Sequence, residues 1–252
     1  MARRRVRKAL TASAAALALT LFLSGCDDRF PDYSYKMTIY AKGKAFSSVR
    51  HVEVEEASSI VDSGGSTVKR RVEGEAVVLD LNGRTYYALL SRPDNADYAQ
   101  FVAGMALSRF IPLPAQKNDV DQAVDDYRRE NSLQDSFGDA ASGLQAMVQI
   151  EGPRDLPRTL PPRRNRLSMQ AWPMFVTFGD PKDPRTVREV SPDAIGVERI
   201  TIEITDEDVT MGIERRLEWL HALGGRYLTG RSTAVGSPYG MHSGYFEQGK
   251  KE

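Results

Sequence analysis

Residues 75–91 have the sequence EAVVLDLNGRTYYALLS, in which two apolar segments are separated only by Asn82-Gly83. The segments 75–81 and 84–91 have the composition of strands. An Asn-Gly pair between two strands favours a type I′ turn, because both central residues of that turn need a positive φ. The stretch therefore predicts a β-hairpin and indicates that the surrounding sheet is antiparallel.

Three segments before the hairpin also have strand patterns. Residues 35–42 (YKMTIYAK) alternate between apolar and polar side chains, a period of two that is typical of a strand with one buried face. Residues 49–55 and 67–73 look similar, and the glycine-containing stretch 63–66 separates them. We expect all three segments to join the sheet.

Two further strands are expected in the second half of the chain. Residues 173–178 (PMFVTF) are almost wholly apolar, and in residues 199–205 (RITIEIT) isoleucines alternate with polar residues. The stretch 180–185 (DPKDPR) between them indicates tight turns. Upstream, residues 151–166 contain four prolines and five arginines. Proline removes amide donors and fixes φ, so this segment should be an exposed, extended connector. It is either a solvated loop or a basic strip that faces anionic headgroups or an acidic partner.

Helices are expected between these groups of strands. Residues 98–105 have the spacing of an amphipathic helix, with Asp94 or Asn95 as a candidate cap. A second helix is expected after Asp119 and a third around residues 141–148. Their apolar stripes are interpreted as core packing rather than as ligand contacts.

The end of the chain combines a predicted helix with a tail. The helix is expected over residues 213–223, with Thr210 as a candidate cap and Gly224-Gly225 as its stop. Glycines then alternate with Tyr and Phe through residues 225–252, so no regular element is expected. Two interpretations stay open: the tail is disordered, or it lies across the domain with its aromatic residues as anchors.

The first 26 residues have the arrangement of an export signal. Met1–Lys8 carries five basic residues, and Ala9–Leu23 is a fifteen-residue stretch without a charge. As a helix this stretch would be about 22 Å long, shorter than the roughly 30 Å hydrocarbon core of a bilayer. A secretory signal is therefore favoured over a permanent membrane span.

Leu23-Ser24-Gly25-Cys26 follows directly and resembles the lipobox of bacterial lipoproteins. The resemblance implies that Leu23, Ser24 and Gly25 are recognised by the lipoprotein signal peptidase. It also implies that Cys26 becomes the acylated first residue of the mature protein, and each buried CH₂ of an acyl chain contributes roughly 0.8 kcal/mol to membrane binding. Asp27 resembles the residue that retains enterobacterial lipoproteins in the inner membrane, which implies a body facing the periplasm. Sorting to the outer membrane stays the alternative.

Composition limits the classes of function. The chain has 34 basic and 34 acidic residues; without the five basic residues of the signal, 29 basic residues face 34 acidic ones, a net charge of −5. A mildly acidic body argues against nucleic acid as a partner, because phosphates are bound by clustered Lys and Arg. Cys26 is the only cysteine, so the sequence excludes an intramolecular disulfide and a two-cysteine metal site.

No catalytic or cofactor motif is evident in the sequence. His51, His221 and His242 are far apart in sequence, and no H-E-x-x-H or Cys/His zinc spacing occurs, so neither a metal nor another cofactor is expected. A carboxylate pair of the glycosidase type has no sequence signature, because its separation depends on the fold. A carboxylate-dependent envelope hydrolase therefore stays an alternative, although a non-enzymatic role is favoured.

Several segments of the body resemble those of an uncharacterised proteobacterial protein family of unknown activity. They are YKMTIY at 35–40, EAVVLDL at 75–81, PMFVTFGDPKDPRTVREV at 173–190 and RITIEITDEDVTMGIERRLEWL at 199–220. The likeness covers most of the mature chain. It implies a single folded unit. Because no activity is associated with that family, the likeness assigns no functional residue in this chain.

Together the patterns predict an α+β fold, a mainly antiparallel sheet with helices packed on one face. The expected organisation is a lipoprotein signal peptide at 1–25, a lipidated tether at 26–34, one domain at 35–224 and the tail at 225–252. We expect a lipid-anchored binding or adaptor module of the cell envelope, held in the membrane by acyl chains on Cys26 and binding an envelope protein. The alternatives are an immunity-type lipoprotein that neutralises a periplasm-acting toxin, and the carboxylate-dependent hydrolase.

Overall fold

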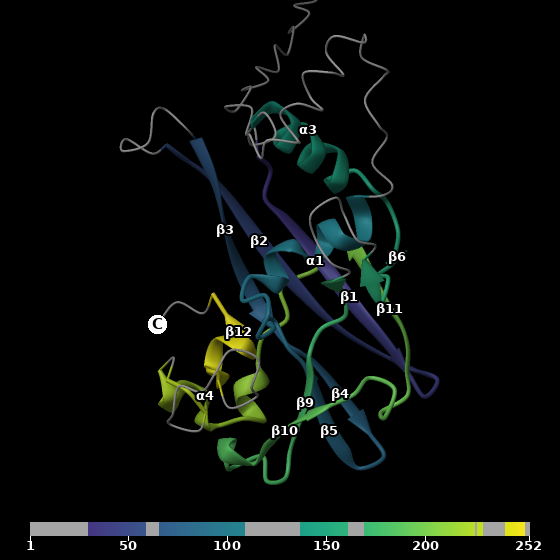
Figure 1. Cartoon of the computed structure of the whole chain (residues 1–252), viewed down its shortest axis with the longest axis vertical. Helices are drawn as coiled ribbons and strands as arrows, with labels where there is room; N and C mark the ends of the chain where they lie inside the picture. The colour runs from purple at the N-terminus through teal and green to yellow at the C-terminus, as the bar shows by residue number, and fades with distance from the viewer. Residues whose placement is uncertain are drawn as a thin grey trace, which may run out of the picture.

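The computed structural model describes residues 30–58, 66–108, 137–160, 169–224, 226–228 and 240–249 (Figure 1). The sites expected in the signal region lie outside the described residues, namely Leu23, Ser24, Gly25, Cys26 and Asp27. The helix expected after Asp119 lies outside them as well. None of the helices that the structure describes is long and apolar enough to cross a membrane.

The largest sheet has six strands in the order β12-β3-β2-β1-β11-β6, and all of its pairings are antiparallel. Burial alternates along β1 as its period of two predicted, with Tyr35, Met37 and Ile39 fully buried. The strands predicted at 35–42, 49–55, 67–73 and 199–205 are confirmed as β1, β2, β3 and β11 of this sheet. The bounds are β1 (Tyr33–Ala41), β2 (Lys44–Ser58), β3 (Ser66–Glu75), β6 (Arg154–Asp155), β11 (Val197–Ile204) and β12 (Glu247–Gln248).

Two tight turns close hairpins in this fold. Asn82 and Gly83 have φ values of 52° and 74°, the positive values that the predicted type I′ turn needs. Lys42 and Gly43 join β1 to β2 in the same way, with φ values of 50° and 70°. This second turn was not predicted, because lysine is a weak turn signal compared with asparagine.

A second, four-stranded sheet contributes residues to an apolar core on each of its faces and is also antiparallel, in the order β10-β9-β5-β4. Leu79 and Phe175 belong to the core shared with the six-stranded sheet, whereas Tyr87 and Val176 belong to a core on the opposite side. All four residues of β9 are buried, which explains why that segment is almost wholly apolar. The bounds are β4 (Val77–Leu81), β5 (Arg84–Ala88), β9 (Phe175–Phe178) and β10 (Val187–Val190), and a separate pair is formed by β7 (Thr159–Leu160) and β8 (Met169–Gln170).

Two apolar cores hold these layers together. The first lies between the six-stranded sheet, β4 and helix α1 (Tyr98–Leu107), whose Val102 is fully buried. The second lies between the outer face of the four-stranded sheet and the C-terminal segments, and includes Phe178, Leu217 and Phe246. The C-terminal segments therefore form a third layer, visible beside β12 and α4 (Trp219–Leu223) in Figure 1.

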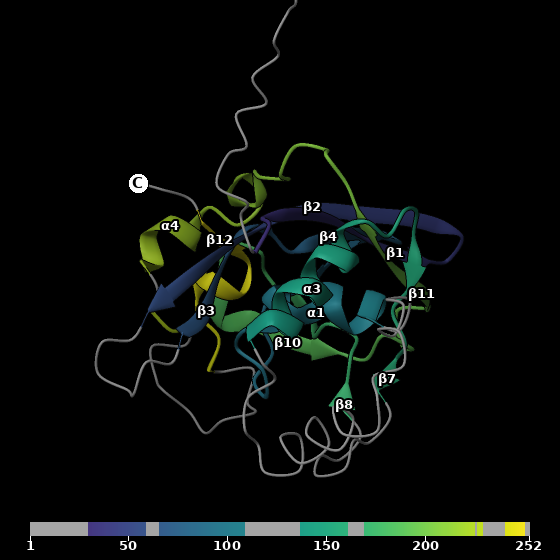
Figure 2. The same cartoon turned by 90° about the horizontal axis from the view of Figure 1, so that it is seen from above.

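The α+β prediction is wrong, because the fold is mainly β. The described residues form 12 strands in three sheets and only three short α-helices, α1, α3 (Phe137–Val148) and α4. In Figure 2, α1 and α3 lie against the inner side of the six-stranded sheet, but they do not form a helical layer. The four-stranded sheet takes that role instead and packs on β1 and β2 through β4. Strand patterns cannot tell whether strands belong to one sheet or to two stacked sheets, since the local alternation is the same.

The helix predicted over 213–223 is interrupted. It forms a 3₁₀ turn at Ile213–Arg215 and then the short α4, which ends at Gly224. Gly224 is left-handed (φ 50°, ψ 45°), which confirms the predicted stop. Thr210 does not cap the helix: its Oγ1 accepts a hydrogen bond from the Val49 amide of β2 at 2.9 Å.

The predicted helices at 98–105 and 141–148 are confirmed as α1 and α3, but neither candidate cap of α1 acts as one. The N-cap is Asp97, without a side-chain capping bond. Asp94 instead pairs with Arg92 at 2.8 Å.

Two segments that were expected to be irregular are packed against the rest of the body. In the connector 151–166, Arg154–Asp155 forms β6 and Leu156 is buried in the first core. In the tail, β12 pairs with β3 and Phe246 is fully buried. Of the two interpretations of the tail, the second therefore holds for residues 240–249.

Candidate functional site

A cleft of about 560 Å³ opens beside the β9–β10 hairpin. Residues 92–94, 172–175 and 189–192 form most of its walls. The buried side chains of Trp172 and Phe175 give it an apolar lining. Clefts of this size with apolar surface and a few polar groups are typical of binding sites.

The Pro/Arg-rich connector builds one wall of this cleft by fixing Trp172. The indole Nε1–H of Trp172 donates to the Leu156 carbonyl at 3.0 Å, and the Arg158 guanidinium lies 5.2 Å from the indole ring centroid. Leu156 is itself fixed to β11, because its amide donates to the Ile200 carbonyl at 2.9 Å. The connector is thus a structural part of the cleft rather than only a solvated loop.

Charged residues of both signs also line the cleft. Arg92 donates to Asp94 through Nε and Nη2 at 2.8 and 3.1 Å, and through Nη1 to the Trp172 carbonyl. The hydrogen bonds from Arg92 hold the pKa of Asp94 below its usual value. Arg158 and Glu189 add one further charge of each sign to the lining. The lining therefore has no formal net charge, which does not favour a phosphate-rich ligand.

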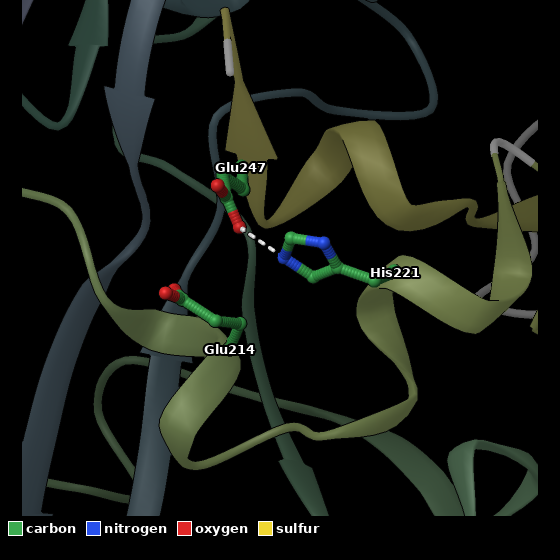
Figure 3. Close-up of side chains that lie close together, drawn as sticks. All are labelled: Glu214, His221 and Glu247. Atoms are coloured by element: carbon green, nitrogen blue, oxygen red, sulfur yellow. Dashed lines mark ion pairs between the residues drawn. The ribbon is translucent and has the colours of Figure 1, made fainter. Parts of the chain in front are cut away.

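A second group of candidate functional side chains lies in the C-terminal layer (Figure 3). Glu214 comes from the 3₁₀ turn at 213–215, His221 from α4 and Glu247 from β12. One ligand atom from each of the three lies within 4.8 Å of the others. His221 Nε2 and Glu247 Oε2 are 4.0 Å apart, and the side chain of His221 is 54% exposed whereas that of Glu247 is 9% exposed. In the part of the chain that the structure describes, these three residues are a group whose ligand atoms lie close enough together to hold a metal ion.

Glu75 lies next to this group and fixes its geometry. It is buried at the end of β3, and its Oε2 accepts a hydrogen bond from the Ile213 amide at 2.7 Å. Burial raises the pKa of Glu75, the Ile213 amide opposes that shift, and the charges of Glu247 and Glu214 raise it further. The Glu75 carboxylate thereby anchors the turn that carries Glu214.

The other two histidines have local structural contacts. His51 Nδ1 lies 3.1 Å from the Ser34 hydroxyl, across the β1–β2 pair. His242 Nδ1 accepts a hydrogen bond from the Gly244 amide at 3.1 Å, and burial lowers the pKa of His242.

The prediction that no metal would be found rested on sequence spacing, and that spacing missed the cluster. Glu214 and His221 are seven residues apart, which would place them on one face of a regular helix, so the sequence spacing could have indicated two of the three members. Glu247 joins them only because the tail folds back onto β3. No spacing rule connects a strand residue of the tail to that turn.

No protein-family model, curated protein or solved structure matches this chain.

Proposed function

We propose that this protein is a lipid-anchored, periplasm-facing lipoprotein of the cell envelope that binds an extended segment of an envelope protein in the cleft beside β9 and β10. The observation that carries the proposal is the cleft lining itself, which combines apolar residues with charged residues of both signs in equal number. Protein interfaces typically combine an apolar centre with a polar rim. A ligand rich in phosphate would need an excess of positive charge instead.

The anchor rests on Leu23-Ser24-Gly25-Cys26, with Asp27 as the signal for retention in the inner membrane. The first described residue, Phe30, is already packed in the core with 5% of its surface exposed. The four residues from Cys26 to Phe30 span at most about 14 Å when fully extended. An acylated Cys26 would therefore hold the body directly at the membrane surface.

The cleft favours binding over carboxylate-dependent hydrolysis. A general acid of that kind needs a carboxyl group whose pKa is raised toward neutrality. Asp94 in the cleft has a lowered pKa because Arg92 donates hydrogen bonds to it. Glu75, whose pKa is raised, is buried and does not line the cleft.

Site-specific photocrosslinking of the full-length chain in its native host tests this proposal. A photoreactive residue replaces Gln170, which is exposed at the cleft, or Lys182, which is exposed in the β9–β10 turn as a control. We expect one discrete protein adduct from position 170 and none from position 182. Arg158→Ala should remove most of the adduct because it removes the side chain stacked on Trp172, whereas Arg188→Ala, outside the cleft on β10, should leave it.

The outcomes separate the candidate functions. A resident envelope protein in the adduct supports the adaptor role, whereas a toxin encoded by a neighbouring gene supports the immunity-type alternative. An adduct that forms equally from both positions, or that persists in Arg158→Ala, contradicts binding in this cleft.

A further inference from the structure

We propose that Glu214, His221 and Glu247 form a binding site for a divalent transition-metal ion, with zinc as the ion of choice. The site is independent of the cleft and of the lipid anchor, and it would join the 3₁₀ turn, α4 and the C-terminal strand β12 through one ion.

The positions of the three side chains suit such an ion. Their ligand atoms lie within 4.8 Å of one another, and His221 Nε2 is 4.0 Å from Glu247 Oε2. Zinc binds histidine nitrogen and carboxylate oxygen at about 2.0–2.2 Å, which places tetrahedral ligand atoms about 3.4 Å apart. Each ligand atom therefore needs to move inward by about 1 Å or less, a shift that side-chain rotation supplies.

Two of the three ligands are held by the backbone around them. Glu247 is paired with Glu75 across β12 and β3, and its side chain is nearly buried. Glu214 follows Ile213, whose amide is bound by the Glu75 carboxylate at 2.7 Å. Ligands that are positioned before the ion arrives lose little conformational freedom on binding, so this arrangement favours affinity.

His221 is the adjustable ligand and sets the class of ion. Its side chain is about half exposed on the single turn of α4, so it can close on an ion held by the two glutamates. Calcium takes six to eight oxygen ligands and magnesium keeps near-ideal octahedral oxygen geometry. One imidazole with two carboxylates instead matches zinc and its transition-metal neighbours, and water completes the coordination on the exposed side.

The bound ion would act as a clamp on the C-terminal layer. The residues next to the ligands in this layer, Ile213, Leu220 and Phe246, are all buried in the second core. Binding that occurs only in the folded state stabilises it in proportion to the logarithm of ligand concentration. If His221 and Glu247 formed only an ion pair, the stability of the folded state would not depend on metal concentration. Such a pair would also add little stability, because exposed ion pairs contribute little.

Zinc titration of the full-length chain, purified from membranes in detergent and stripped with a chelator, tests the proposal. We expect saturable binding of one ion per chain by calorimetry and a thermal unfolding midpoint that rises with zinc concentration. Calcium and magnesium at the same concentrations should leave the midpoint unchanged. Cys26→Ser, titrated in parallel, excludes zinc binding by any Cys26 thiol that is left unacylated, and it should bind zinc equally well.

Two substitutions of ligands decide the outcome. His221→Ala removes a half-exposed side chain, and Glu214→Gln keeps the shape of its side chain, so both should fold, which circular dichroism checks. We expect each to weaken zinc binding at least tenfold, while His51→Ala, which changes a histidine elsewhere on the sheet, leaves it unchanged. Absence of saturable zinc binding by the unsubstituted chain, or binding in either variant within tenfold of it, overturns the site.

Discussion

Among the described residues, Arg50 is the largest side chain that is completely buried. Its Nε donates to the Glu75 carbonyl oxygen at 3.2 Å and its Nη1 to the Tyr35 hydroxyl at 3.5 Å, whereas Nη2 has no hydrogen-bond partner in the described part of the chain. Gly74 makes room for it, because a Cβ there would lie 2.9 Å from Arg50 Cγ. A buried cation with incomplete hydrogen bonding is costly, so Arg50 is expected to reduce stability.

Arg50→Met should leave the free energy of unfolding unchanged or increase it. The substitution removes the buried charge and keeps most of the volume. No acceptor is orphaned, because Ser48 Oγ still donates to the Glu75 carbonyl at 2.8 Å and the Tyr35 hydroxyl still donates to the Ala99 carbonyl at 2.7 Å. Arg50→Ala should instead lower the free energy of unfolding by about 2–5 kcal/mol through a cavity. Urea denaturation measures the free energy of unfolding of both variants. An equal decrease in Arg50→Met and Arg50→Ala would show that the buried charge of Arg50 is not destabilising.

Glu75 makes stability depend on pH. Burial and the nearby charges of Glu247 and Glu214 raise its pKa in the folded state above the usual value of 4.5. The folded state therefore binds the Glu75 proton more tightly than the unfolded state does. The resulting contribution to the free energy of unfolding is present at low pH and is lost as pH rises through the raised pKa of Glu75.

Glu75→Gln should remove this pH dependence, since the amide oxygen can still accept from Ile213 and carries no charge. Between about pH 4 and about pH 7, with chelator present, the wild-type chain should lose stability relative to the variant. Urea midpoints measured across that range test the sign. Parallel curves for the two chains would show that Glu75 titrates in the folded state as it does in the unfolded state.

At the scale of elements, the C-terminal segment is part of the core rather than an appendage. The ring of Phe246 packs on three other rings, with centroid distances of 6.0 Å to Tyr87, 5.8 Å to Phe178 and 5.7 Å to Trp219. The amide of Ala76 donates to the Phe246 carbonyl at 2.8 Å, which continues the pairing of β12 with β3. The segment therefore covers one face of the four-stranded sheet.

Phe246→Ala should lower the free energy of unfolding by about 3–5 kcal/mol, because it removes a fully buried aromatic ring from the second core. Tyr227→Ala is the matched control, since Tyr227 is 41% exposed and its loss should change stability by no more than about 0.5 kcal/mol. Chemical denaturation of both variants measures the difference. Similar small effects would mean that the segment does not pack as described.

At the scale of the whole molecule, the position of the expected anchor orients the body. The start of β1 is close to α1, since the Tyr33 hydroxyl donates to the Gln100 carbonyl at 3.3 Å. In Figure 1 this end of β1 lies near α3, and the turns of the β4–β5 and β9–β10 hairpins lie at the opposite end of the molecule. A short tether at Cys26 would thus direct these hairpin turns away from the bilayer.

Cys26→Ser should leave an unlipidated precursor whose signal peptide is not removed, because the lipoprotein signal peptidase acts after acylation of the thiol. Metabolic labelling with a fatty acid and intact mass measurement of the membrane-bound protein test this in the native host. The unsubstituted chain processed alongside is the control. Acyl incorporation into the Cys26→Ser chain would contradict the assignment of the anchor.

The local elements were predictable because local patterns encode them. The period of two in β1, the Asn82-Gly83 turn and the stop at Gly224 depend on residues within a few positions of each other. The α+β expectation was wrong because the choice between a helical layer and a second sheet depends on which surfaces meet. The break in the helix predicted over 213–223 has a similar cause, since the Glu75 carboxylate holds the turn at Ile213 from a distant strand.

The sequence by itself determined the longer strands, the Asn82-Gly83 turn and the expectation of a lipidated Cys26, because short-range patterns and a contiguous motif carry that information. Only the tertiary structure decided that the strands form two stacked sheets and that the tail completes the second core. It also decided the Glu214, His221 and Glu247 cluster and the cleft at Trp172. Their members are separated along the chain, and no local rule states which distant side chains will meet.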